Sequence, residues 1–157
     1  MSKLMINSYE EFERFAGKEL GVSEYHRITQ EQIDQFADAT LDHQWIHVDS
    51  DRARKESPYG NTISHGYLSL SLLPYLWNQI IQVNNITMLV NYGIENFKFG
   101  EPVVVNGEVR IKAKLKSIVN LRGTAKVEVE VVMEIKDGRK PAFKGVVVFL
   151  YQFKQDS

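Results

Sequence analysis

Residues 65–83, HGYLSLSLLPYLWNQIIQV, form an apolar run that is longer than an ordinary strand. The apolar side chains recur at intervals of three and four residues, as on a helix, and cover two adjacent stripes of its surface. The stripes comprise Leu68, Leu72, Leu76 and Ile80, and Leu73, Trp77 and Ile81. A helix that is apolar around much of its girth should be buried. Pro74 removes one of its backbone hydrogen bonds, so we expect a bend or a division there.

After residue 84 the pattern becomes that of strands with one buried face. Apolar and charged residues alternate over residues 109–116 and again over 125–135. Asp137 and Gly138 predict a hairpin turn into a last strand at residues 145–153, and another strand is expected over 87–96, before Pro102. With the buried helix, this order predicts an α+β fold in which a curved antiparallel sheet holds the helix against its concave face.

The basic residues of the strand at 109–116 face solvent, but they do not require a nucleic-acid partner. The next strand offers Glu128, Glu130 and Glu134 on its own solvent face. Cross-strand ion pairs therefore explain both sets of charges.

The N-terminal part, residues 1–27, is expected to be helical and rich in loops. Phe12, Phe15 and Ala16 predict a short helix that ends near Gly17 or Gly21. A second helix begins at a capping box formed by Thr29 and Gln32 and ends close to Asp42. Its apolar face comprises Ile33, Phe36, Ala37 and Leu41. We expect one domain over residues 1–157, with residues 28–157 as its core.

The composition excludes several classes of protein. The 157 residues carry a net charge of −1, which provides no positive field for nucleic acid or anionic lipid. The absence of cysteine excludes disulfides and thiolate chemistry and fits a reducing compartment. No segment has the length and apolarity of a signal peptide or a membrane span. We therefore expect a cytoplasmic protein that binds neither nucleic acid nor membrane.

Asp42 and His47 form a candidate acid/base pair. They stand five positions apart in a predicted loop and bracket Trp45 and Ile46, which suggests that the loop folds inward and is partly desolvated. Burial and mutual interaction shift pKa values into the range that catalysis uses. A carboxylate and an imidazole so placed could hold and activate one water molecule.

The start of the long helix is a candidate oxyanion site. Ser64 is a possible N-cap, so the backbone N–H groups of His65, Gly66 and Tyr67 would point out of the positive end of the helix dipole. Glycine at position 66 would let a carbonyl oxygen approach these N–H groups without meeting a Cβ.

Other interpretations of these residues compete with the catalytic one. An aspartate after a helix often bonds only to nearby backbone, the His65 ring could simply bond a neighbouring loop, and Gly66 could serve close packing alone.

His43 and His47 have helical ligand spacing, but Trp45 and Ile46 and the charged residues after them argue against a helix there, so no metal is expected. No Gly-x-Ser-x-Gly or phosphate-binding glycine motif occurs. His26 is expected to be a surface or hydrogen-bonded histidine.

Two segments carry a resemblance to a known family. ITQEQIDQFADATLDHQWIHVDSDRARKESPYGNTISHGYLSLSLLP (residues 28–74) resembles the MaoC-like hydratases and dehydratases, in the branch that contains nodulation protein N. The later segment NYGIENFKFGEPV (residues 91–103) is similar to a second motif of that family. Ser64 stands where the family often has alanine, and Lys98, Phe99 and Gly100 stand where it often has Arg-Phe-Pro.

The resemblance implies a hot-dog fold, in which an antiparallel sheet wraps a central helix, and a homodimer with the sheets joined edge to edge. It also implies reversible hydration of a trans-2-enoyl-CoA to an (R)-3-hydroxyacyl-CoA, with no cofactor beyond the coenzyme A of the substrate. Asp42 and His47 match the catalytic pair, and Ser64 matches a position near the pair that supports it. Gly66 matches the residue whose N–H holds the thioester oxygen, and His65 and Ser64 are counted with it at the expected thioester-binding site. The remaining expected substrate contacts are Trp45, Tyr67, Asn91 and Lys98. Trp45, Tyr67 and Leu68 either line an acyl tunnel or only pack in the core.

Two rival functions remain open. A hot-dog thioesterase would normally use a carboxylate on the central helix, and residues 65–83 contain neither Asp nor Glu. A non-catalytic module that binds acyl-CoA or an acyl-carrier protein would not need Asp42, His47 and Gly66 together. Hydration of an enoyl thioester is therefore the favoured prediction.

Overall fold

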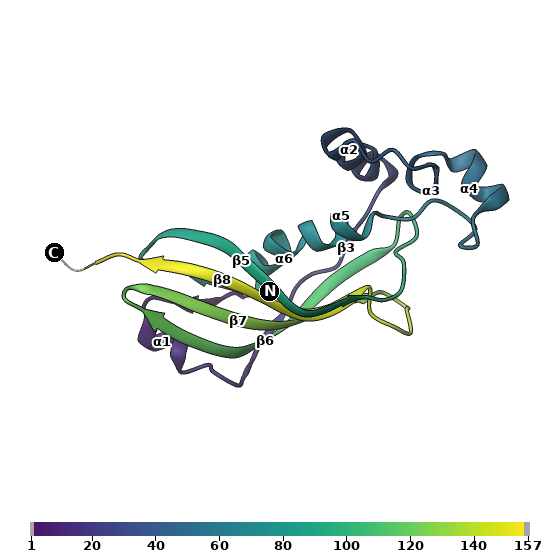
Figure 1. Cartoon of the computed structure of the whole chain (residues 1–157). Coiled ribbons are helices and arrows are strands. Elements are labelled where there is room, and N and C mark those ends of the chain that lie inside the picture. Colours follow the sequence, from purple (N-terminus) through teal and green to yellow (C-terminus); the bar gives the residue numbers. More distant parts are fainter. Residues whose placement is uncertain (1, 156–157) are drawn as a thin grey trace.

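The computed structural model describes residues 2–155, and its main feature is a strongly curved antiparallel sheet (Figure 1). The strands lie in the order β2-β6-β7-β8-β5, and β3 also pairs with β6. Their bounds are β2 Glu19–Val22, β3 His26–Arg27, β5 Ile86–Phe99, β6 Glu108–Leu121, β7 Thr124–Ile135 and β8 Phe143–Phe153. The four long strands include each segment for which the alternating pattern predicts a strand.

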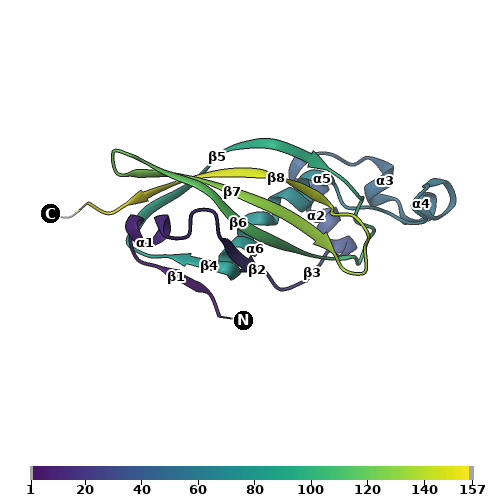
Figure 2. The same ribbon diagram turned by 90° about the horizontal axis from the view of Figure 1, so that it is seen from below.

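The buried helix lies against the concave face of this sheet, as predicted (Figures 1 and 2). It consists of α5 (Gly66–Ser71) and α6 (Leu73–Ile80), divided just before Pro74. All seven residues of the two predicted stripes are buried. Trp77 packs on Phe149 of β8 with ring centroids 5.4 Å apart. This sheet wrapped around a helix is the hot-dog arrangement that the resemblance implies. Within residues 2–155, no helix combines the length and apolarity needed to cross a bilayer.

The prediction of a helix is wrong for its last three residues, 81–83. Residues 81–83 form strand β4 (Ile81–Val83), which pairs in parallel with β1 (Leu4–Ile6). The helix ends because Ile81 adopts an extended conformation, and its side chain is still buried there. A strand with apolar residues can bury them as well as a helix can, so the local pattern does not separate the two.

The predicted cross-strand ion pairs form at Glu128 and Glu134, whereas Glu130 makes no ion pair within residues 2–155. Arg110 lies opposite Glu134, with 3.2 Å between its Nη2 and a carboxylate oxygen. Lys116 lies 3.9 Å from Glu128. The basic stripe therefore faces an acidic one and is not a free cationic surface.

The N-terminal part contains more strand than predicted. Helix α1 (Tyr9–Glu13) forms near the expected residues, but β1, β2 and β3 surround it. Helix α2 (Gln30–Thr40) begins as predicted, since the Thr29 hydroxyl accepts from the Gln32 N–H. The second bond of a capping box is absent, because the Gln32 side chain bonds to His26 Nε2 at 2.9 Å instead.

The end of α2 corrects a further prediction. Leu41 was expected on the apolar face of the helix, but it is 80% exposed. It adopts a left-handed conformation with φ of 67° and ends the helix, which turns its side chain away from the core. Asp42 therefore leaves the helix at a sharp angle.

The segment after Asp42 is helical, where a loop was predicted. His47 lies in the short helix α3 (Trp45–Val48), and the charged residues that follow form α4 (Ser50–Glu56). Asp49 caps α4 by accepting a hydrogen bond from the Arg52 N–H at 3.0 Å. Helices α2, α3 and α4 gather at one end of the molecule, beyond the start of α5 (Figure 1).

Candidate active site

His47 is held in a defined orientation and protonation state. It is only 8% exposed, and its Nδ1 donates a hydrogen bond to the backbone carbonyl of Ile63 at 2.8 Å. A carbonyl oxygen can only accept, so Nδ1 carries the proton and Nε2 of the neutral ring keeps its lone pair. Gln30 fixes the same turn from α2, because its Nε2 donates to the His47 carbonyl at 2.8 Å. The side chain thus offers one basic nitrogen.

The surroundings keep this imidazole neutral. Burial lowers the pKa of His47 below its ordinary value, and the neighbouring His65 lowers the pKa further, whereas the Ile63 carbonyl and the Asp42 carboxylate oppose the shift. Desolvation is the largest of these effects because it penalises the charged ring. At neutral pH the ring can therefore accept a proton.

Asp42 lies close to this base but is more open to solvent. Its carboxylate accepts a long hydrogen bond from the Gln44 N–H at 3.4 Å, and the residue is exposed. The prediction that the loop is partly desolvated thus holds for His47 and is wrong for Asp42. The exposed carboxylate can meet solvent water, but Asp42 is not among the residues that line the cavity into which His47 opens.

His65 connects the two members of the pair. It is 2% exposed, and its Nε2 donates to the backbone carbonyl of Asp42 at 3.0 Å. Its ring stacks on that of His47, with centroids 3.9 Å apart and planes at 23°. Phe36 of α2 packs against it from 4.9 Å. The predicted alternative use of His65, a bond to a neighbouring loop, is therefore present.

The prediction that Ser64 caps the long helix is wrong. His65 occupies the N-cap position without a side-chain cap bond. The Ser64 hydroxyl instead donates to the His65 carbonyl at 3.0 Å and lies 3.2 Å from the Ser69 hydroxyl. Gly66 and Tyr67 nevertheless occupy the first turn of α5, where backbone N–H groups have no partner within the helix.

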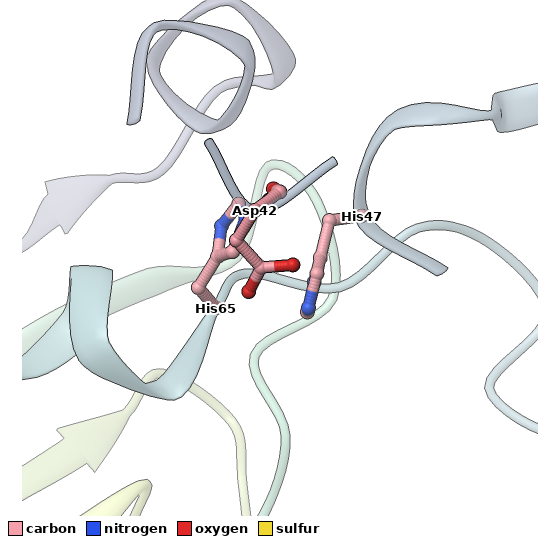
Figure 3. Close-up of side chains that lie close together, drawn as sticks. All are labelled: Asp42, His47 and His65. Atoms are coloured by element: carbon pink, nitrogen blue, oxygen red, sulfur yellow. The ribbon is translucent and has the colours of Figure 1, made fainter. Parts of the chain in front are cut away.

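The carboxylate and the two imidazoles gather into one cluster (Figure 3). One possible ligand atom from each of Asp42, His47 and His65 lies within 4.8 Å of the others. Lone pairs of an imidazole lie in the plane of its ring, and the planes of the two histidines are stacked and nearly parallel. These lone pairs therefore do not converge on one ion. The geometry suits acid/base work on a water molecule better than metal binding.

A cavity of about 350 Å³ opens beside this cluster. Its lining comprises His47, Ile63, Ser64, Gly66, Tyr67, Ser69, Phe99, Gly100, Glu101, Pro102, Val103 and Ala142. A Cβ at position 66 would lie 3.1 Å from the Phe99 ring, so the glycine keeps this wall open. His47 and the start of α5 thus face the same space.

The structure brings only some of the predicted substrate contacts to this cavity. Tyr67 lines it. Trp45 lies under the Arg52 guanidinium at 4.2 Å, outside the lining residues, and Leu68 is buried in the core.

Asn91 and Lys98 lie on β5 and are not among the residues that line the cavity. Asn91 lines a second groove of about 320 Å³ between the helix and strands β5 and β8. Lys98 is exposed and lies opposite Lys144 of β8. Neither residue shares the space that His47 faces.

Ser69, Phe99 and Glu101 line the cavity and were not predicted to do so. Ser69 stands one helical turn after Gly66, which is a signal that spacing alone could have supplied. Glu101 reaches the cavity because the Gly100 and Glu101 N–H groups bond to the carbonyls of Ala142 and Pro141. That contact joins distant parts of the chain and leaves no local pattern.

One family model and two known proteins match most of this chain. The model of the MaoC like domain matches residues 11–136. The 3-hydroxyacyl-thioester dehydratase Z of Mycobacterium tuberculosis is 42% identical over 128 residues, which cover 81% of this chain and 84% of the relative. Nodulation protein N of Rhizobium leguminosarum bv. viciae is 41% identical over 140 residues, or 87% and 86% of the two chains.

A solved structure shares the fold. The R-hydratase PhaJ1 from Pseudomonas aeruginosa superposes with a TM-score of 0.70 at 16% identity, covering 90% of this chain and 83% of that one. At this identity the likeness concerns the fold alone.

Proposed function

The chain belongs to the MaoC-like dehydratase family, and from this premise we propose that it adds water reversibly to a trans-2-enoyl thioester, giving an (R)-3-hydroxyacyl thioester. The dehydration direction is the same reaction reversed. We propose a coenzyme A thioester as the substrate and no further cofactor.

One observation carries the proposal: a neutral imidazole, fixed in one tautomer, stands beside a carboxylate at the wall of a cavity. The Ile63 carbonyl holds the proton on Nδ1 of His47, which leaves Nε2 free to accept. Asp42 offers a second acceptor within the same cluster. Two acceptors can bind both hydrogens of one water molecule and turn its oxygen lone pair toward a substrate.

The proton balance of hydration fits such a pair. The water oxygen forms a bond to C3 while the electrons of the C2–C3 double bond move toward the thioester carbonyl and form an enolate. One water proton goes to the Asp42–His47 pair, and a proton from the pair is delivered to C2. The pair then returns to its starting protonation state, and because the two groups are coupled, the roles are assigned to the pair.

Gly66 is proposed to stabilise the enolate. Its N–H belongs to the first turn of α5, where it has no helical partner and where the dipole favours negative charge. A donor aimed at a developing oxyanion is worth most when water is excluded, as in a cavity lined by Ile63, Phe99 and Val103. Tyr67 lies at the same wall and can contact the thioester.

Lys98 remains a proposed contact for the phosphates of coenzyme A. It lies opposite Lys144, and like charges directly opposite each other destabilise a sheet unless an anion separates them. Both lysines lie two residues from lining residues of the cavity, Gly100 and Ala142. An anionic cofactor tail that leaves the cavity at this edge would meet them.

Thioester hydrolysis is the second candidate, and Glu101 is the observation that favours it. Helices α5 and α6 carry no acidic residue, but the exposed Glu101 lines the cavity together with His47. A carboxylate there could direct water at the carbonyl carbon instead of C3. The two reactions differ in their products, because only hydrolysis releases a free thiol.

One assay separates these functions. Purified protein is mixed with crotonyl-CoA, and the loss of conjugated enone absorbance is followed together with the release of free CoA thiol. The hydratase proposal predicts loss of absorbance without thiol, and chiral analysis should find the (R)-3-hydroxy product. Thiol release that disappears in Glu101→Gln would establish hydrolysis instead, and neither signal across several chain lengths would contradict both.

A further inference from the structure

His65 is the residue that touches both members of the proposed catalytic pair. It donates from Nε2 to the backbone carbonyl of Asp42, and its ring face covers that of His47. Phe36 packs on the ring from α2, so His65 is held by the helix that precedes Asp42. A residue that only filled space would need neither the bond nor the stacking geometry.

The other ring nitrogen of His65, Nδ1, is buried and makes no hydrogen bond to the described residues. Because Nε2 donates to a carbonyl, the neutral ring has no proton on Nδ1, and this nitrogen is buried without a hydrogen-bond partner among the described residues. Native proteins rarely leave such an acceptor unpaired, so its retention calls for a functional reason.

We propose that His65 is a positioning residue, which fixes Asp42 through its backbone carbonyl and fixes the ring plane of His47 by stacking. It holds the carboxylate and the basic nitrogen at the separation that one water molecule can bridge. The inference rests on the proposed hydratase function for its kinetic part only. Near-attack geometry is sensitive to displacements of about 1 Å, which can cost on the order of 100-fold in rate.

The proposed role of His65 can be measured through the pKa of His47, which depends on the charges around that ring. Asp42 faces it from the α2–α3 connection, His65 from the start of α5, and Tyr67 and Glu101 line the cavity into which it opens. Of these, His65 opposes the charged form of His47, and Asp42 favours it. Removal of the His65 imidazole should therefore move the pKa of His47 upward, since one of the effects that lowers it is lost.

Two substitutions separate positioning from packing. His65→Phe keeps a flat ring of similar size but has no N–H for the Asp42 carbonyl, whereas His65→Gln keeps an N–H donor and loses the ring. We expect His65→Phe to lower kcat on the order of 10- to 100-fold with KM little changed, and His65→Gln to recover part of kcat. His26→Gln is the matched control, because His26 is also a hydrogen-bonded histidine, with Gln32 as its partner, but it belongs to neither the cluster nor the cavity lining.

NMR titration of the imidazole nitrogens supplies the readout that does not depend on substrate. The proposal predicts that wild-type His47 holds its proton on Nδ1 and that its pKa rises in His65→Phe. If His65→Phe keeps the wild-type kcat and an unchanged His47 titration, His65 is packing alone and the proposal is wrong. If His65→Phe does not fold, the same comparison is made with His65→Gln, whose unchanged tautomer, titration and kcat would equally overturn it. A wild type without hydratase activity would contradict the proposed function, while the titration would still decide the role of His65.

Discussion

At the scale of single residues, the site depends on His47 being a neutral base. The Ile63 carbonyl selects the tautomer, and burial lowers the pKa of the ring. Each effect comes from the fold, since Ile63 stands 16 residues away in the sequence.

The lowered pKa of His47 predicts a particular pH dependence. Above this pKa the ring is neutral and can accept a proton, and below it the base is lost. We expect kcat/KM to hold through neutral pH and to fall as the pH drops through a pKa that lies below the ordinary histidine value. A pH–rate profile of crotonyl-CoA hydration tests this, and an acid limb centred above the ordinary value would disagree with the buried environment of His47.

A larger residue at position 66 should disturb the backbone N–H group that is proposed to stabilise the enolate. In Gly66→Ala the new Cβ would meet the Phe99 ring at 3.1 Å, so the ring or the first turn of α5 must shift. We expect kcat/KM to fall on the order of 10-fold or more, because the N–H donor moves from its place. Gly93→Ala is the control, since a Cβ there meets no atom within 4 Å. Equal rates for the two variants and wild type would argue against an oxyanion role for this turn.

At the scale of elements, the central helix is joined to the sheet by a buried hydrogen bond. Trp77 of α6 donates from Nε1 to the Tyr151 hydroxyl of β8 at 2.7 Å. Burial raises the pKa of Tyr151, so this hydroxyl stays protonated. The bond satisfies both polar groups inside an otherwise apolar layer.

Trp77→Phe should leave the Tyr151 hydroxyl without its donor. We expect it to lose about 3 kcal/mol of unfolding free energy from the unpaired polar group and the smaller ring together. Tyr151→Phe combined with Trp77→Phe should cost less than the sum of the single changes, because no unpaired group remains. Urea unfolding of the three variants measures this cycle, and strict additivity would show that the bond does not couple helix and sheet.

The elements also show what the sequence could predict. The spacing of apolar residues shows directly which faces of α5, α6, β6 and β7 are buried, so these elements could be predicted. The ion pair between Arg110 and Glu134 follows from the same alternation. The extended conformation of residues 81–83 depends on pairing with β1, about 75 residues earlier, and could not be predicted from local spacing. Likewise, Asp42 and His47 could be named from their spacing and the family resemblance, whereas the entry of Glu101 into the cavity follows from backbone bonds to residues 141 and 142.

At the scale of the whole molecule, β5 is an uncovered edge of the sheet. Among residues 2–155 it pairs with β8 alone, and five of its large apolar residues between positions 88 and 94, on both faces, are exposed. These residues are Met88, Leu89, Val90, Tyr92 and Ile94. A long apolar edge strand of this kind would aggregate unless something covers it. We propose that a second copy of the chain covers it in a homodimer.

A charged residue introduced into β5 should therefore prevent dimerisation and give a monomer. Met88→Lys is expected to shift the mass measured by light scattering from that of two chains to that of one. Leu121→Lys is the matched control, because both residues are 51% exposed and Leu121 lies at the β6–β7 turn, away from β5. A wild type that is already monomeric, or a Met88→Lys variant that stays dimeric, would contradict the edge-to-edge dimer.

Acid/base catalysis by the pair is tested most directly by the crotonyl-CoA hydration rates of Asp42→Asn, His47→Gln and the double variant, with Asp38→Asn as the control. Asp38 is an exposed acid of α2 that bonds to His43 and is not part of the cluster of Asp42, His47 and His65. Because the two groups act as a pair, each single change should lower kcat by about 10²- to 10⁴-fold, and the double change should cost little more than either alone. Asp38→Asn should match wild type. Hydration that persists at the wild-type rate in folded Asp42→Asn or His47→Gln protein would contradict the central claim.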